Sequence, residues 1–253
     1  MGGSTDYILR AEGLTKQFLG FYAVNNVNLN VRRHSVHALI GPNGAGKTTC
    51  FNLLTTFVKP SAGTIHFNGL AIEASHPAAV AERGLVRSFQ ISAVFGQLSV
   101  LENVRVALQR KSRWNYAFWR SQAVLDVLND RALELLDMVG LGAWADMPAS
   151  DLPYGHKRVL ELATTVALDP ELILLDEPMA GLGHEDIGPI TQLIRRVAVG
   201  RTVLMVEHNM KVIAELCDQV TVLQSGQVLA EGCYADVSSD PRVIDAYVGG
   251  AHA

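Results

Sequence analysis

The chain has 253 residues, of which 49% are hydrophobic, and its 21 Lys and Arg against 25 Asp and Glu give a formal net charge of -4. This composition supports a substantial core and excludes an intrinsically disordered chain. The mild acidity gives no electrostatic reason to expect nucleic acid as a partner. We find no apolar run near the roughly 18 residues of a spanning helix and no secretory leader, so we expect a cytoplasmic protein.

In the first part of the chain the sequence predicts strands followed by a helix. Apolar residues alternate with Asn, as in half-buried strands of an opening antiparallel lobe, at Val27, Leu29 and Val31. We expect these strands, within the first 35 residues, to be short. The apolar run 36–40 predicts a strand that ends in a Gly-rich turn, and residues 47–57 predict a helix. Residues 61–73 predict a short strand or hairpin.

The middle of the chain predicts helices, in a lobe at about 91–159. Apolar residues recur at helical spacing in two stripes: Leu101, Val104, Ala107 and Leu108, then Leu133, Leu136 and Val139. A further helix is expected from Pro153 to about Leu168, where Asp169-Pro170 stops it.

The last part predicts a parallel sheet. Residues 172–175 and 202–206 are apolar runs typical of buried strands, with a helix expected between them at about 186–198. Both runs end in polar residues, which places candidate chemistry at the strand ends. Ser225-Gly226 predicts a hairpin turn, and a short helix is expected at the C-terminus.

Residues 41–48 read GPNGAGKT and match the phosphate-loop pattern between a predicted strand and a predicted helix. Glycines allow positive φ, so backbone N–H groups can surround phosphates at the positive end of the helix. Lys47 would add a mobile positive charge, and the Thr48 hydroxyl would hold Mg²⁺. We predict that nucleotide is bound by Asn43, Gly44, Ala45, Gly46, Lys47, Thr48 and Thr49. The alternative is a structural Gly-rich turn.

Asp176 and Glu177 follow directly on one apolar strand, and His208 follows the other. Successive residues of a strand point to opposite faces, so the two carboxylates can have different roles. One carboxylate would hold the water shell of Mg²⁺, and the other would orient the attacking water as a general base. We assign the metal to Asp176 and the water to Glu177. His208 would bond the terminal phosphate or hold that water. The alternatives are a solvated acidic loop and a structural histidine.

Together these motifs resemble an ATP-binding cassette (ABC) subunit, over one domain at about 7–249. The resemblance implies an α/β fold: a P-loop NTPase core with a mixed, mostly parallel sheet, an antiparallel β subdomain and an inserted α-helical subdomain. The core would comprise about 1–90 and 160–249. Its cofactors would be ATP and Mg²⁺.

The resemblance also implies roles for further residues. Arg87-Ser88-Phe89-Gln90 resembles the Q-loop, in which Gln90 would contact the metal and the attacking water. Phe18 would stack on adenine with Val24 beside it. Residues 180–183 resemble the D-loop, and Glu207-His208 the switch loop.

The signature motif of the family is degenerate here, as Leu152-Pro153-Tyr154-Gly155-His156. Pro153 replaces the usual Ser, so backbone N–H groups near Tyr154 and Gly155 would be left to contact the phosphate bound by a partner cassette. His156 replaces the usual Gln, and Gly183 replaces the polar D-loop residue. The composite site that this chain completes across a dimer is therefore expected to be weakened.

In this family two cassettes, identical or different, sandwich two ATP molecules and drive two transmembrane permease subunits. Residues 98–104, EPMAGL and VIDAYVG resemble the cassettes of branched-chain and hydrophobic amino acid importers, which work with a periplasmic or extracellular solute-binding protein. We expect a peripheral position on the inner face of the cell membrane. Residues 110–120, RKSRWNYAFWR, would face a permease or anionic lipid, or form a solvated helix.

Three other functions remain open from the sequence. The core motifs are shared with exporters and lipid extractors. The altered signature is also compatible with a nucleotide-dependent regulatory subunit, although Lys47, Asp176, Glu177 and His208 are retained. A soluble phosphate-loop kinase would have no use for a signature-like helix.

Overall fold

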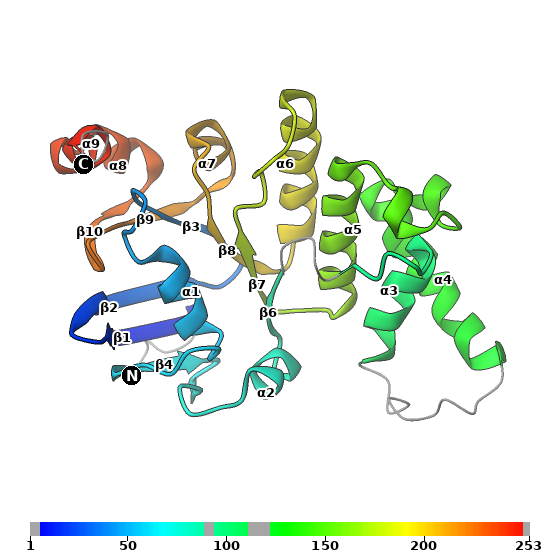
Figure 1. Cartoon of the computed structure of the whole chain (residues 1–253), viewed down its shortest axis with the longest axis horizontal. Coiled ribbons are helices and arrows are strands. Elements are labelled where there is room, and N and C mark those ends of the chain that lie inside the picture. The colour runs from blue at the N-terminus through cyan, green and yellow to red at the C-terminus, as the bar shows by residue number, and fades with distance from the viewer. Residues whose placement is uncertain (1–5, 89–93, 111–121, 250–253) are drawn as a thin grey trace. The chain divides into compact units, whose positions relative to one another are not determined.

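The computed structural model describes residues 6–88, 94–110 and 122–249. The chain divides into two compact units (Figure 1). The sheet unit comprises 1–87, 171–179 and 198–253, and the helical unit comprises 88–170 and 180–197. The helical unit covers a wider range than the expected lobe at about 91–159.

The sheet unit opens with an antiparallel sheet in the order β2-β1-β4-β5. Its strands are β1 (Tyr7–Phe18), β2 (Phe21–Arg32), β4 (Ala62–Phe67) and β5 (Leu70–Ala71). The antiparallel lobe is confirmed, but the expectation of short strands was wrong, because β1 and β2 each run for 12 residues. The pairing of β1 with β2 continues over this length despite register shifts at four points.

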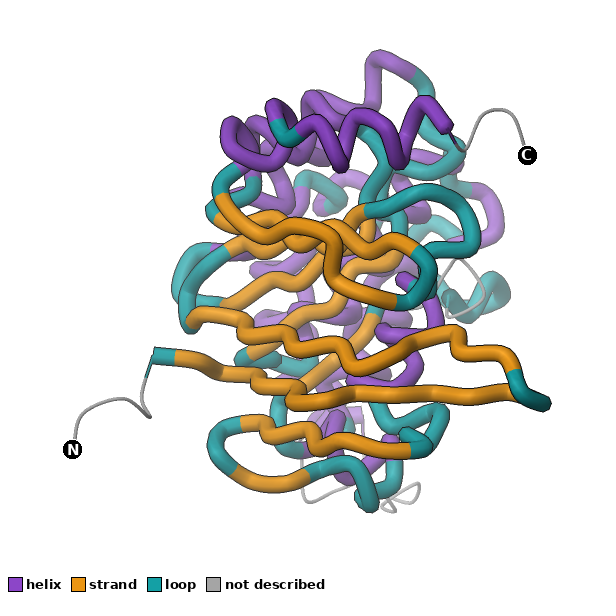
Figure 2. The backbone as a smooth tube through the Cα atoms, turned by 90° about the vertical axis from the view of Figure 1, so that its left-hand side faces the viewer, coloured by secondary structure: helices purple, strands orange, loops and turns teal. Residues whose placement is uncertain are grey.

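The second sheet has the order β10-β9-β3-β8-β7-β6. Its strands are β3 (Val36–Ile40), β6 (Leu85–Arg87), β7 (Leu172–Asp176), β8 (Thr202–Val206), β9 (Gln219–Gln224) and β10 (Gln227–Gly232). All neighbours pair in parallel except β9 and β10, which form the expected hairpin. Figure 2 shows the strands of this unit running side by side across the view. The predicted mixed, mostly parallel sheet is confirmed.

Parallel pairing brings the carboxyl ends of β3, β8, β7 and β6 to one edge. Val206 pairs with both Leu39 and Asp176, and Arg87 pairs with Leu174. The loops that follow these strands therefore leave the sheet at the same edge, as expected for a ligand site in an α/β fold.

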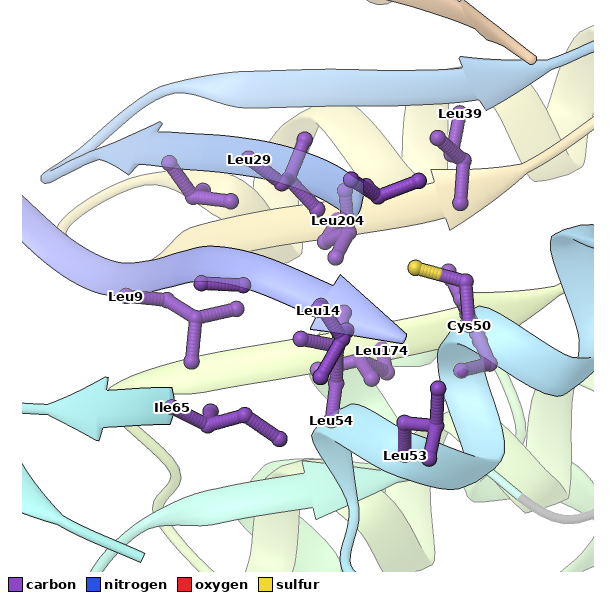
Figure 3. Close-up of a cluster of buried hydrophobic side chains, with 14 of the residues drawn as sticks. Leu9, Leu14, Leu29, Leu39, Cys50, Leu53, Leu54, Ile65, Leu174 and Leu204 are labelled. Carbon is purple, nitrogen blue, oxygen red and sulfur yellow. The ribbon is translucent and has the colours of Figure 1, made fainter. Parts of the chain in front are cut away.

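Helix α1 (Lys47–Leu54) packs into the core of the sheet unit. Cys50, Leu53 and Leu54 on α1 are fully buried, together with Leu14 of β1 and Leu174 of β7 (Figure 3). Burying each of these leucine side chains contributes roughly 1.5 to 3 kcal/mol. The helix thereby fixes the loop that precedes it.

Helix α1 is shorter than the predicted 47–57. Thr55 caps its C-terminal end and Thr56 has a φ of 59°, which is incompatible with continuing the helix. The hydroxyl of Thr55 also donates to the carbonyl of Phe51 at 2.7 Å. The remaining helices of the sheet unit are α2 (Pro77–Glu82), α7 (Met210–Leu216), α8 (Tyr234–Ser239) and α9 (Pro241–Gly249).

The helical unit contains α3 (Val100–Gln109), α4 (Gln122–Val139), α5 (Tyr154–Ala167) and most of α6 (His184–Ala198), with short 3-10 turns η2 (Gly142–Trp144) and η3 (Ala149–Asp151). Ser99 and Glu102 form a capping box that begins α3. Of the second predicted apolar stripe, Leu136 and Val139 are buried, whereas Leu133 is 38% exposed. The helix from Pro153 to about Leu168 is confirmed.

Candidate functional site

The loop between β3 and α1 has a backbone that only glycine can supply at two positions. Gly41 and Gly46 have φ values of 149° and 99°. A Cβ at Gly41 would lie 2.1 Å from the Leu223 carbonyl oxygen, and one at Gly46 would lie 2.3 Å from the Ala23 carbonyl oxygen. The glycines are thus needed both for their dihedral angles and for close backbone packing.

The same loop is held by the turn between β9 and β10. The Gly226 N–H donates to the Ala45 carbonyl at 3.0 Å, and the Asn25 N–H donates to the Gly226 carbonyl at 2.8 Å. Strand β2 and the β9–β10 hairpin therefore both brace the loop. Such bracing preorganises backbone N–H groups for an anionic ligand.

Lys47 is the first residue of α1 and is 7% exposed. Its ammonium group donates to the carbonyls of Gly41 at 2.7 Å and Pro42 at 2.9 Å. An ammonium has three donors, so these bonds account for two of them. Burial lowers the pKa of Lys47, and the negative charges of Glu177 and Asp176 partly oppose this shift.

The other predicted phosphate-binding residues differ in exposure. Asn43, Gly44 and Thr48 are exposed, Gly46 and Thr49 are half-buried, and Ala45 is buried. The backbone N–H of Ala45 donates to Pro42 at 3.2 Å within the loop. The contacts of these residues with nucleotide stay predictions. Thr48 lies exposed near the start of α1, where its side chain could reach a metal ion or a phosphate.

Asp176 ends β7 and pairs with an arginine at the end of the neighbouring strand. Nη2 of Arg87 donates to Oδ2 of Asp176, and Nη1 of Arg87 donates to Oδ1 of Asn52 at 2.6 Å. The side chains of Arg87 and Asp176 are 14% and 10% exposed. Arg87 thus links strands β6 and β7 to helix α1.

The oxygen ligands at this edge fit Mg²⁺. Thr48 offers a hydroxyl and Asp176 offers Oδ1, while the bond from Arg87 is made to Oδ2. Mg²⁺ prefers hard oxygen ligands and is commonly held by one or two protein oxygens with substrate phosphates and water. Thr48 and Asp176 are therefore suitable ligands for a Mg²⁺ ion that is also bound by the phosphates of a nucleotide.

Glu177 and His208 meet although they lie 31 residues apart in the chain. Nε2 of His208 is 2.9 Å from Oε1 of Glu177, and the two side chains are 42% and 38% exposed. Glu177 has a φ of 48°, in the left-handed region, and its N–H donates to the Val206 carbonyl at 2.9 Å. The backbone turn after β7 therefore aims this carboxylate at the end of β8.

Glu207 positions both loops, a role that the sequence motif did not reveal. It is 4% exposed, and its carboxylate accepts hydrogen bonds from the N–H groups of Met179 at 3.3 Å, His208 at 2.8 Å and Asn209 at 3.0 Å. One acid thus joins the loop after β7 to the loop after β8. The sequence does carry a sign of this role, because Glu207 is an acid at the end of a buried strand and directly precedes His208.

The two predicted base contacts differ in this structure. Phe18 is 46% exposed, and Nζ of Lys16 lies 5.1 Å from its ring centroid, so part of the ring is open to solvent and could stack on a base. Val24 is fully buried in the core, and its side chain presents no surface to a base. The burial of Val24 disagrees with the predicted contact of its side chain, and the base contact of Phe18 stays a prediction.

The signature-like segment lies in the helical unit at the start of α5. Pro153 is the N-cap residue and supplies no side-chain cap. The Tyr154 hydroxyl donates to the Ala180 carbonyl at 3.1 Å, which ties the segment to the D-loop-like residues 180–183. Gly155 is buried, and a Cβ there would lie 2.8 Å from Oδ2 of Asp186.

The substituted residues of the two motifs have local contacts. The rings of His156 and Trp144 lie 4.9 Å apart between centroids. A Cβ at Gly183 would meet the carboxylate of Glu185 at 2.6 Å. Gln90, predicted to act in catalysis and at the metal, lies outside the described residues, as do residues 111–120 of the aromatic and basic segment.

Comparisons with known proteins agree with this geometry. A family model described as "ABC transporter" matches residues 24–180, and one described as "Branched-chain amino acid ATP-binding cassette transporter" matches residues 227–253. The high-affinity branched-chain amino acid transport ATP-binding protein LivG of Salmonella typhimurium is 38% identical, over 96% of this chain and 98% of that protein. The high-affinity branched-chain amino acid transport ATP-binding protein BraF of Pseudomonas aeruginosa is 37% identical at the same coverage.

Solved structures give the same result. An ATP-binding cassette of an ABC transporter in its ADP conformation matches with a TM-score of 0.84 at 30% identity, covering 96% of this chain and 99% of that chain. A bacterial ABC transporter cassette solved as a dimer matches with a TM-score of 0.76 at 27% identity, covering 89% of this chain and 98% of that chain. Across the described residues, every helix is too short or too polar to cross a bilayer.

Proposed function

Because the chain belongs to the ABC transporter family of ATP-binding cassettes, we propose that it hydrolyses ATP to power the import of branched-chain or other hydrophobic amino acids, or of related small molecules. The amino acid assignment is supported by the names of relatives that match nearly the whole chain and by the match of residues 227–253. The contact between Glu177 and His208 carries the ATPase assignment.

The phosphates are bound by the loop that β3 and α1 hold in place. Its N–H groups and the dipole of α1 attract the phosphate oxygens. The ammonium group of Lys47 is largely shielded from water, so it attracts these oxygens more strongly than an exposed ammonium would. Phe18 stacks on the base. Binding of this kind orients the terminal phosphate toward the strand ends, where Asp176 and Glu177 lie.

Thr48 and Asp176 would hold Mg²⁺ beside the phosphates. The metal supplies positive charge to the oxygens on which negative charge develops during hydrolysis. The chain contributes a hydroxyl from the start of α1 and a carboxylate from the end of β7, which are both oxygen ligands that Mg²⁺ accepts.

Glu177 orients and deprotonates the attacking water, while His208 holds Glu177 in place. With one carboxylate oxygen 2.9 Å from the imidazole, the other is left to accept a hydrogen bond from water. Glu207 fixes both backbones, so the pair depends on a buried acid that does not itself take part in the reaction.

A second cassette, identical or different, completes the phosphate site. Two permease subunits provide the transport path across the membrane, and the cassettes bind them at its cytoplasmic face. A solute-binding protein would deliver the amino acid to those permeases. A related cassette solved as a dimer supports the pairing. With Pro153 in the signature-like segment, the half-site that this chain completes lacks one hydroxyl, which is worth on the order of 1.5 to 3 kcal/mol if unreplaced.

Two linked experiments test this function in cells that make the protein. The tagged chain, purified from native membranes in mild detergent, should retain two polytopic membrane proteins and a cassette. Cells that carry Glu177→Gln in this chain should lose uptake of radiolabelled leucine while keeping the complex assembled. Recovery of soluble proteins alone would refute the transporter role. Normal leucine uptake by cells whose mutant complex has lost ATP turnover would refute leucine as its substrate.

A further inference from the structure

Arg87 is a charged residue of the site for which the ATPase mechanism above gives no role. It is the last residue of β6 and lies beside β7 in the sheet. Its guanidinium donates from Nη2 to Asp176 and from Nη1 to Asn52 of α1. One side chain thus connects the carboxylate predicted to bind metal with the helix that begins at Lys47.

The surroundings keep the Arg87 guanidinium in this position. Its side chain is 14% exposed, and its Cζ lies 5.8 Å from the centroid of the Phe51 ring. Arginine presents its donors in a planar fork, so the two acceptors fix the orientation of the group. The ion pair between Arg87 and Asp176 is therefore largely buried and held in one geometry. An exposed surface ion pair, by contrast, would contribute little to stability.

The geometry divides the Asp176 carboxylate between two partners. Arg87 bonds Oδ2, which leaves Oδ1 for a metal or its water shell. The guanidinium thus places a positive charge against one oxygen of this carboxylate. A fixed positive charge at hydrogen-bond distance, largely shielded from water, opposes the approach of a second cation to the same carboxylate.

We propose that Arg87 neutralises Asp176, so that Mg²⁺ enters this site only together with the phosphates of the nucleotide and not alone. The proposal rests on the proposed function, in which Asp176 holds the metal. Arg87 acts through Asp176 and does not itself contact the metal or the reacting atoms. The phosphates of ATP bring enough negative charge to outweigh the guanidinium, so the metal binds once nucleotide is present.

Binding of Mn²⁺, followed by electron paramagnetic resonance, tests the proposal without relying on turnover. Without nucleotide, wild-type protein should bind Mn²⁺ only weakly, and Arg87→Gln should bind it at least about tenfold more tightly. The gain should vanish in the double variant Arg87→Gln with Asp176→Asn. Equal Mn²⁺ affinity in wild type and Arg87→Gln would overturn the proposal.

Two matched variants separate charge from structure. Arg87→Lys keeps the charge but loses the planar fork, so its affinity for Mn²⁺ should stay close to that of the wild type. Asn52→Ala removes the acceptor of the second Arg87 hydrogen bond and keeps the charge, so it should also leave Mn²⁺ affinity unchanged. If Arg87→Lys gained affinity as Arg87→Gln does, the effect would come from geometry and the charge-based proposal would fail.

The wild-type protein provides a measurement that does not depend on whether Arg87→Gln folds. Tight Mn²⁺ binding without nucleotide that Asp176→Asn abolishes would by itself overturn the proposal. The metal assignment of the proposed function has a separate test, because Asp176→Asn should then weaken Mn²⁺-dependent ATP binding. If Asp176→Asn left that binding unchanged, the metal assignment would fail, whatever the result at Arg87.

Discussion

Nε2 of His208 lies 2.9 Å from Oε1 of Glu177, although the two residues follow different strands of the parallel sheet. The contact exists because β7 and β8 are neighbours and end at the same edge. It is reinforced by Glu207, which accepts hydrogen bonds from both loops. The contact between Glu177 and His208, which we propose to be catalytic, is therefore a product of sheet topology.

Glu177→Gln should bind ATP with near wild-type affinity and lose turnover by about 10² to 10⁴-fold. The substitution keeps the shape of the side chain and removes the proton acceptor. Fluorescent nucleotide titration and phosphate release measure the two properties. Turnover within tenfold of wild type would remove Glu177 from the role of general base.

Glu207→Ala should destabilise the sheet unit by about 3 kcal/mol, because three N–H groups lose their acceptor in a buried position. The matched control is Glu82→Ala, which changes an exposed acid on α2. Urea denaturation compares the two. Equal midpoints would mean that water or another group satisfies those N–H groups.

Gly46→Ala should abolish nucleotide binding or folding, whereas Gly44→Ala should cost only the strain of a positive φ, about 1 kcal/mol. A Cβ at Gly46 would meet the Ala23 carbonyl oxygen at 2.3 Å, while nothing lies within 4 Å of one at Gly44. Thermal melts and nucleotide titration distinguish them. Similar effects of both substitutions would contradict the described loop geometry.

Because His37 is buried, we expect the free energy of unfolding to fall as the pH is lowered. Burial lowers the pKa of its imidazole from 6.5 to about 4. Thr221 donates its hydroxyl proton to Glu231, so Nε2–H of His37 donates to Thr221 at 2.8 Å. Above pH 6.5 the folded and unfolded chains are both neutral at this residue. As pH falls from 6.5 to 4, only the unfolded chain takes the proton.

The resulting loss of stability is about 3 kcal/mol, because each unit of pKa difference is worth about 1.4 kcal/mol. His37→Gln should flatten this part of the profile of unfolding free energy against pH. The exposed His76→Gln serves as the control and should leave the slope unchanged. An unaltered slope in His37→Gln would show that other groups cause the acid sensitivity.

Pro153→Ser should stabilise helix α5 by about 1 kcal/mol, because a serine at the N-cap can accept from the first turn while Pro153 provides no cap. The new hydroxyl should also raise, or leave unchanged, turnover of the assembled complex. Pro153→Ala is the matched variant without a hydroxyl. A large fall in turnover specific to the serine variant would show that Pro153 has its own role.

The sequence by itself determined the features that depend on local spacing. GPNGAGKT between a strand and a helix, and the apolar runs that end at Asp176 and Val206, specify a phosphate-binding loop and a parallel sheet. These follow from backbone requirements and from hydrophobic periodicity, which neighbouring residues carry. Family and fold class could be predicted for the same reason.

Only the tertiary structure decided which side chains meet. Arg87 and Asp176 come together because β6 pairs with β7, and Val24 is buried because it packs in the core beneath α1. The φ of Glu177 and the three bonds to Glu207 likewise arise from loops that separate strands bring to one edge. Such contacts depend on strand order and side-chain packing between residues far apart in the chain, and no local pattern encodes them.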